Sequence, residues 1–279
     1  MAQTGVIGTV SGLRPRITVN TIRITTIVVL LVLWEVLAAV GRSGLLYKDV
    51  VPSSIQIGLA IIHEIFDPAF YHHLGITLAE HVVGFTIGST IAVTVGIAMG
   101  ANPFFRKMIE PYLNGIGSTP KIIFLPILFL LFGTGIESKM AKGALSAFFP
   151  VVFSTTLGMM LISPVLLRVG QTFSLTRRQM VSKIYMPSMV NPIITGLRLG
   201  MAIAVIGILV AEIKFSNGGL GYRIAEYYDQ FAIASMYALI IIIFALAAAA
   251  NVAMTVLQDR LNIKQGGSAT RNAGLGAST

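Results

Sequence analysis

The sequence has no cysteine, few histidines and little charge. Of its 279 residues, 11% are Asp, Glu, Lys or Arg, whereas 55% are apolar. A typical soluble domain carries about 25% charged residues, so this composition argues against a water-soluble enzyme. Without cysteine there is no disulfide framework, thiolate metal site or cysteine nucleophile, and with 4 His a multi-histidine metal site is not expected. We predict no catalytic, cofactor-binding or metal-binding residue.

Two further absences concern nucleotides and nucleic acids. The chain contains no G-x-x-x-x-G-K-[ST] motif, so we expect it not to bind ATP through a P-loop. Its 20 Lys and Arg against 11 Asp and Glu give a net charge of +9, which suits either a nucleic-acid-binding protein or a membrane protein with basic loops. A mean hydropathy of +0.83 favours the membrane, and no nucleic-acid partner is expected.

Long apolar runs take the place of charge. Crossing a bilayer requires about 20 apolar residues, and six runs are long enough: residues 24–40, 81–105, 111–136, 143–167, 189–211 and 231–258. The third run carries Pro120 and Pro126, so it can be a broken helix where neighbouring groups satisfy the freed backbone. We predict an all-α integral membrane protein with six transmembrane helices between residues 24 and 258.

The distribution of charge predicts the orientation. Loops on the side of the N-terminus hold most of the Lys and Arg, and the opposite loops hold most of the acids. Because cytoplasmic loops collect basic residues, both termini are predicted to lie in the cytoplasm. Residues 1–23 form the N-terminal segment. Residues 259–279 form a tail, and its residues 265–279 are small, polar and Gly-rich, a composition that predicts disorder.

Small residues recur every fourth position in the second and fifth runs. Such spacing places them on one helix face and lets another backbone approach closely. They either pack helices together or line a pathway, and the sequence leaves both interpretations open. These residues are Gly84, Gly88, Ala92, Gly96 and Gly100 in the second run, with Gly196 and Gly200 in the fifth.

The loop of residues 163–188 is basic and contains no acid. Its polar and apolar spacing predicts a short helix, a break near residues 173–175, and a second helix that stops at Pro187. Such a loop can bind anionic lipid headgroups or dock a cytoplasmic partner, and composition does not separate the two. Its basic residues are Arg168, Arg177, Arg178 and Lys183.

Charged residues inside membrane spans are costly and usually functional. Lys121 in the third run can face a cavity. Arg198 in the fifth can contact an anion in a pathway or extend to the membrane surface. Glu212 is expected to close the fifth span at the outer interface.

The basic loop and its surroundings resemble binding-protein-dependent ABC importer permeases. That family has E-A-A, then a Gly, then I-x-L-P. This chain has Arg168, Val169 and Gly170 at the first position, Ser174 at the second and Ile184 to Pro187 at the third. Further segments resemble the nitrate/sulfonate/taurine-type permeases over about residues 30 to 260: Trp34–Glu35, Pro52–Ser53, Pro120–Ile127, Phe132–Gly133, Ile194–Gly200, Val210–Glu212 and Gly218–Tyr222.

The resemblance implies a type I ABC importer permease (MetI-like) architecture in the cell inner membrane. Two permease copies would surround the pathway, and each would dock a cytoplasmic ABC ATPase, which binds ATP and magnesium, through residues 168–187. An extracytoplasmic solute-binding protein would deliver a small anion such as a sulfonate or nitrate.

Two departures from the pattern bear on the docking loop. Arg168 reverses a charge on the docking surface, and Ser174 replaces a glycine that readily forms a left-handed turn. ATPase pairing is then either specialised or weakened. The alternative to this function is an ion-coupled secondary transporter without an ATPase subunit.

Overall fold

A computed structural model describes the backbone of residues 19–43 and 50–275. No strand occurs among these residues, so the predicted all-α class is confirmed there. The chain divides into two compact units, Met1–Gly58 and Leu59–Thr279. The predicted N-terminal segment of residues 1–23 lies mostly outside the described residues.

The first unit contains α1 (Val19–Arg42) and the start of α2 (Ser54–Phe66). The side chain of Trp34 donates to the backbone oxygen of Pro52, 3.0 Å away. Glu35 accepts hydrogen bonds from both the backbone N and the Oγ of Ser54, at 3.1 and 3.0 Å. Since the first amides of a helix have no partner within it, Glu35 caps the start of α2.

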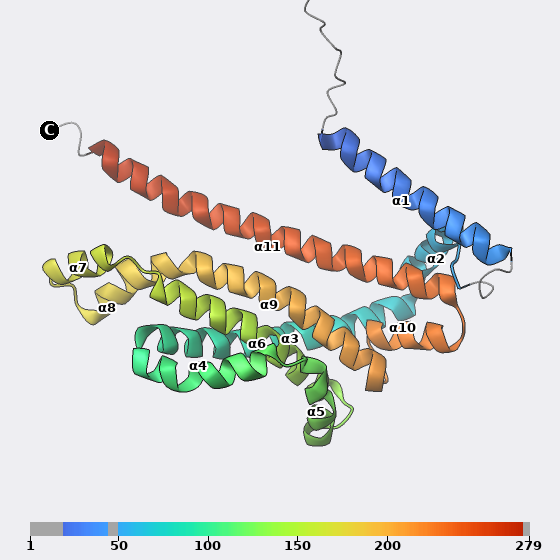
Figure 1. Ribbon diagram of the computed structural model, residues 1–279, viewed down its shortest axis with the longest axis horizontal. Helices are drawn as coiled ribbons and strands as arrows, with labels where there is room; N and C mark the ends of the chain where they lie inside the picture. The colour runs from blue at the N-terminus through green and yellow to red at the C-terminus, as the bar shows by residue number, and fades with distance from the viewer. Residues whose placement is uncertain (1–18, 44–49, 276–279) are drawn as a thin grey trace, which may run out of the picture. The chain divides into compact units, whose positions relative to one another are not determined.

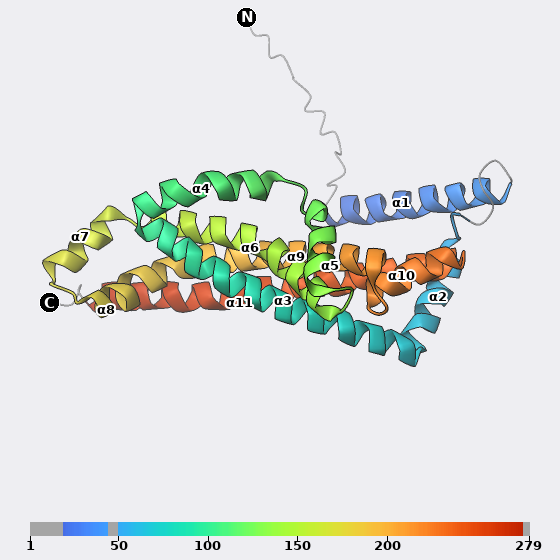
Figure 2. The ribbon, with the colours of Figure 1, turned by 90° about the horizontal axis from the view of Figure 1, so that it is seen from below.

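The second unit is built on three long helices, α3 (Pro68–Ala101), α6 (Ile136–Met160) and α9 (Met186–Phe215). They run side by side, and α6 packs along both of the others (Figures 1 and 2). Between α3 and α6 lies an apolar core of Ala92, Met99, Val151 and Val152. The helix α10 (Leu220–Asp229) packs against α3, α9 and α11 (Ile233–Leu275).

The third predicted span is broken. It consists of α4 (Pro103–Ser118), a 3-10 turn η1 (Lys121–Phe124) and α5 (Leu125–Phe132), with a bend of 95° between α4 and the segment after it. Pro120 lies at the bend, where it cannot donate a helical hydrogen bond. Among the described residues five helices are long and apolar enough to cross a membrane, or six if this bent pair is one span.

Two element bounds differ from the prediction. The fourth span begins at Ile136 rather than at residue 143. Lys139 and Lys142 precede the uncharged run, but the helix includes them because both are buried and bonded to backbone carbonyls. The helix α11 continues to Leu275, so the structure has helix over residues 265–275 where a disordered tail was predicted. Each residue added to an existing helix gains a hydrogen bond. Residues 276–279 lie outside the described residues.

The basic loop folds as α7 (Pro164–Thr172), α8 (Arg177–Met180) and a π-helical turn η2 (Val181–Tyr185). The two predicted short helices and the break between them are present. The second helix, however, does not stop at Pro187. It continues through η2 into α9 as one run, Arg177–Phe215. In the π turn Met186 donates its amide to the carbonyl of Val181, a wider spacing that accommodates the missing amide of Pro187.

Candidate functional site

The small residues of α3 face α6 at close range. A Cβ on Gly88 would lie 2.7 Å from the Cα of Ala144, and one on Gly84 would meet the backbone of Met140. Ala92 is fully buried in the core. Farther along α3, Gly96 faces Thr155 and Gly100 faces the side chain of Met159. These positions therefore pack α3 onto α6.

The opposite side of α6 is packed in the same way by α9. A Cβ on Gly196 would lie 2.8 Å from the Cβ of Ser154, and one on Gly200 would lie 3.1 Å from the carbonyl oxygen of Ala147. The predicted ladder residues thus hold α6 between two helices. Their role as a pathway wall stays a prediction.

At the α7 end of the bundle, α7 packs against η2, the turn that follows α8. Gly170 is buried, and a Cβ there would lie 2.7 Å from the Cδ1 of Ile184. Thr176 begins α8 with a capping box, in which it accepts from the amide of Gln179 while the Gln179 side chain accepts from the amide of Thr176. Ile184 belongs to an apolar cluster with Ile162 and Met189. The segment is therefore seated on the bundle by its apolar side.

Ser174 has φ 48°, which is the left-handed conformation. Its amide donates to the carbonyl of Gln171 (2.9 Å), and the amide of Leu175 donates to the carbonyl of Gly170 (3.0 Å). These two bonds form a Schellman motif at the end of α7. The left-handed turn is therefore made by serine, although glycine suits it better.

The basic residues of this segment point outward. Among the described side chains none of them forms an ion pair. The segment thus presents unpaired positive charge on its exposed side, together with Pro187 at the start of α9. The exposed basic residues are Arg168, Arg177, Arg178 and Lys183.

The two predicted pathway charges have different surroundings. Arg198 is half-buried on α9 and forms no ion pair with any described residue. Lys121 is half-buried in η1, and its Nζ donates to the carbonyl of Gly117, 2.9 Å away. The carbonyl of Lys121 accepts in turn from the Nζ of Lys142, also at 2.9 Å.

Glu212, predicted to close the fifth span, lies in the last turn of α9, where it is fully buried. Its Oε1 accepts from the Oγ1 of Thr77 (2.6 Å) on α3, and its Oε2 accepts from the amide of Gly221 (2.7 Å). The amide of Leu220 donates to Thr77 (2.8 Å), and Gly219 adopts φ 97°. One carboxylate thus joins α3 and α9 to the N-terminus of α10, where negative charge is favoured.

A second polar cluster joins α10 to the region between α2 and α3. The Nε of Arg223 lies 2.7 Å from Glu64, and its Nη2 bonds Asp67 and the hydroxyl of Tyr227. Tyr227 donates to Glu64 (2.6 Å). In the sequence, Glu64 and Asp67 lie far from Arg223 and Tyr227. Only their placement near the same end of α10 reveals the cluster.

The pKa values in this cluster follow from burial and pairing. The hydrogen bond from Arg223, with one from the amide of Ala69, lowers the pKa of Asp67. Burial and the neighbouring Glu64 carboxylate raise the pKa of Tyr227 to about 12. Burial alone would lower the pKa of Arg223, but its bond to Asp67 and the charge of Glu64 outweigh burial and raise it.

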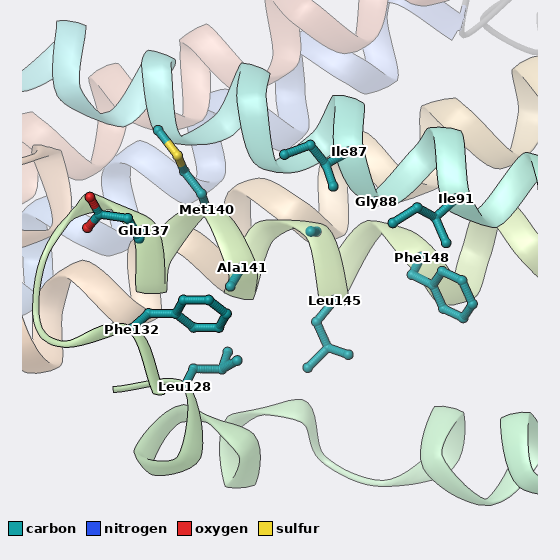
Figure 3. A pocket seen from close by; sticks show the side chains of 11 residues that line it. Ile87, Gly88, Ile91, Leu128, Phe132, Glu137, Met140, Ala141, Leu145 and Phe148 are labelled. Carbon is teal, nitrogen blue, oxygen red and sulfur yellow. The ribbon is translucent and has the colours of Figure 1, made fainter. Parts of the chain in front are cut away.

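A groove of about 570 Å³ opens between α3, α5 and α6. Figure 3 shows Leu128 and Phe132 of α5 on one side and Ile87 of α3 on the other, with Glu137 as the only charged side chain among those that line it. With so little polar surface, the groove offers few partners to a charged solute. A smaller cavity of about 250 Å³ near α10 is lined by Glu80, Lys139 and the loop of residues 216–218.

Known proteins are similar to this chain in sequence and in fold. The family described as "Binding-protein-dependent transport system inner membrane component" matches residues 86–263. A putative aliphatic sulfonates transport permease protein, SsuC of Bacillus subtilis, is 29% identical over 71% of each chain. The formylaminopyrimidine transport permease protein ThiX of Halalkalibacterium halodurans is 31% identical over 83% of this chain and 91% of its own.

One further relative and one solved structure are similar to this chain over most of their own length. The taurine transport system permease protein TauC of Escherichia coli is 26% identical over 86% of this chain and 88% of its own. Among solved structures, a chain of the methionine ABC transporter MetNI, in an inward-facing conformation, superposes with a TM-score of 0.62. It covers 69% of this chain and 96% of that chain at 18% identity, so this likeness concerns the fold alone.

Proposed function

Because the chain belongs to the family of binding-protein-dependent transport system inner membrane components, we propose that it forms the membrane pathway through which a small anion is imported. It is a multi-pass permease subunit of an ABC importer, of the nitrate/sulfonate/taurine type. The observation that carries this function is the family match over residues 86–263, which includes both the α7–α8 segment and α10. An ion-coupled secondary transporter is not supported.

ATP hydrolysis belongs, in this proposal, to a separate cytoplasmic subunit that binds ATP and magnesium. The chain has no P-loop motif. The helices α7 and α8 form a compact element to which such a subunit can bind. Because η2 connects α8 to α9 without interruption, displacement of α8 by a closing ATPase pair would move α9. No chemistry in this chain is needed for that coupling.

The basic side of the α7–α8 segment is the proposed docking surface. Arg177 and Arg178 lie exposed in the first turn of α8, and no described acid pairs with them. With Arg168 also exposed, the surface is positive, so the matching ATPase surface should be acidic. Anionic lipid headgroups are the second partner that this charge favours.

The remaining partners follow from the type of permease. A solute-binding protein would deliver the solute at the α10 end, opposite the α7–α8 segment. Both termini would then lie in the cytoplasm, as the positive charge of the intervening loops predicts. A second copy of this chain would complete the pathway, with the apolar groove of Figure 3 available to pack against it or against lipid.

The solute is proposed from charge and from similarity. The relatives include permeases named for sulfonates, taurine and nitrate, and one named for formylaminopyrimidine. An anion is favoured because Lys121 and Arg198 lie within the predicted spans without acidic partners among the described residues. Selection among anions would rest largely with the binding protein.

Uptake into proteoliposomes that contain the full complex tests the function. Sulfonate or nitrate uptake should stop with vanadate and persist with a proton uncoupler. Uptake that resists vanadate and collapses with the uncoupler would exclude the proposal. Changing Arg177 and Arg178 to Glu should abolish co-purification of the ATPase, while Lys107→Glu, at an exposed site on α4, should not. A double variant that keeps its ATPase and its activity would show that the docking surface lies elsewhere.

A further inference from the structure

Two lysines meet at the break in the third span. Lys142 lies on α6 with 2% of its surface exposed, and its Nζ donates to the carbonyl oxygen of Lys121. The Nζ of Lys121 donates to the carbonyl oxygen of Gly117 and lies 4.9 Å from the centre of the Phe149 ring. Gly117 belongs to the last turn of α4, whose carbonyls lack partners within the helix and favour a nearby cation. The break in the span therefore gathers two ammonium groups.

Neither lysine has an acidic partner among the described residues, where every ion pair involves an arginine. The charged neighbour that acts on Lys142 is Lys121 itself. Lys139, one turn earlier on α6, differs because it faces Glu80 and Glu212. Two like charges thus lie close together, one of them almost completely buried, with no opposite charge to balance them.

This arrangement has unused capacity for a ligand. An ammonium group has three N–H donors, and each lysine donates to one carbonyl. The remaining donors are unsatisfied by the described residues, and Phe149, with 5% of its surface exposed, keeps water from one side. Buried charges are normally paired, so an anion is the missing partner.

We propose that Lys121 and Lys142 together bind an oxyanion, a carboxylate, sulfonate or nitrate group, on its way through the permease. An oxyanion fits better than a halide because its separate oxygens accept hydrogen bonds from both ammonium groups at once. The proposal rests on the anion-import function above and assigns the residues that recognise the anion's charge.

A thermal-shift experiment tests binding directly. The complete complex, in nanodiscs of phosphatidylcholine, is heated with and without methanesulfonate or nitrate. Either anion should raise the Tm of the wild type and of Lys107→Met, a matched control on the exposed part of α4. It should not raise the Tm of Lys121→Met or Lys142→Met. Without anion, Lys142→Met should melt no lower than the wild type, because it removes an unpaired buried charge.

A lipid headgroup carries the same chemistry as the solute, so a second arm separates the two sources. The same variants are melted in nanodiscs that contain phosphatidylglycerol. If that lipid raises the Tm through Lys121 and Lys142 while methanesulfonate and nitrate do not, the site is a lipid site and the proposal is wrong. An equal shift in all variants shows a non-specific salt effect, which also overturns it.

Transport measurements connect the site with the function. At limiting anion, loss of a charge-assisted contact should slow vanadate-sensitive uptake by ~10-fold or more in Lys142→Met, while Lys142→Arg retains most of the rate. If the wild type takes up the anion and Lys121→Met and Lys142→Met do so at the same rate, the site is refuted but the importer function is left intact. Absence of vanadate-sensitive anion uptake in the wild type refutes the function itself. If Lys142→Met fails to fold, the uptake rates of Lys142→Arg and Lys142→Gln are compared instead. The site requires that Lys142→Arg be the faster of the two, and equal rates refute it.

Discussion

The Schellman turn at the end of α7 makes a quantitative prediction, because Ser174 occupies a left-handed position with φ 48°. Ser174→Gly should stabilise the turn. The substitution removes only a small exposed side chain and leaves the two backbone hydrogen bonds, from Ser174 to Gln171 and from Leu175 to Gly170, in place.

The expected magnitude comes from two opposing terms. A residue with a Cβ costs roughly 1–2 kcal/mol in the left-handed conformation, and glycine relieves this strain. Glycine also gives the unfolded chain more freedom, which costs about 0.5–1 kcal/mol. Taken at the midpoints of the two ranges, the net stabilisation is about 0.8 kcal/mol. Asparagine, which tolerates this conformation, should lie between serine and glycine, and valine should be worse than serine.

Hydrogen exchange of the detergent-solubilised protein measures this local stability. The amide of Leu175 exchanges only when its bond to Gly170 opens, so exchange should slow by a factor of roughly 2 to 5 in Ser174→Gly, since 1.4 kcal/mol is tenfold. Ser182→Gly is the matched control. Ser182 lies within η2 and has no positive φ, so glycine there should speed exchange of its own segment.

Equal or faster exchange at Leu175 in Ser174→Gly would refute the strain argument, as would an equal effect of glycine at both serines. The same variant bears on coupling. Since serine already forms the left-handed turn, the departure from the family's glycine leaves the α7–α8 geometry intact. Uptake by Ser174→Gly should therefore stay close to that of the wild type. A large gain would show that serine weakens coupling.

Three further predictions concern the bundle and α10. Gly88→Ala should destabilise the fold by about 1–3 kcal/mol through overpacking, measured by thermal unfolding, whereas Gly75→Ala, with no atom within 4 Å of the new Cβ, should not. Glu212→Gln keeps the shape of the side chain, but its amide can accept only one of the two hydrogen bonds from Thr77 and Gly221. The loss should lower the stability of the fold by about 1–3 kcal/mol. Unchanged hydrogen exchange of the α10 amides would contradict this. Because Arg223 lowers the pKa of Asp67, this carboxylate stabilises the fold above its unfolded pKa of about 3.9, and the contribution is lost as the pH falls through the lowered value. In Asp67→Asn, the free energy of unfolding should therefore fall less steeply between about pH 5 and pH 2 than in the wild type. An unchanged pH dependence would refute the pairing of Asp67 with Arg223.

The sequence by itself determined the class of protein and much of its packing. Sparse charge and long apolar runs required a membrane, since a chain with so little polar surface cannot cover itself in water. The four-residue spacing of Gly84 and Gly88 placed them on one helix face where another backbone can approach closely, because helix geometry repeats nearly every four residues. The segments that resemble the importer permeases, such as Ile194–Gly200, were enough to identify the family.

Tertiary structure alone decided where the charges lie. Lys139 and Lys142 end an uncharged run in the sequence, yet both are buried in α6 because the broken third span and the loop after it offer them carbonyl groups. The sequence places Glu212 near the end of a span, but only the fold shows that Thr77, distant in sequence, and the turn before α10 bury it. Periodicity describes one helix at a time, whereas the burial of a charge depends on partners that only the folded chain brings together.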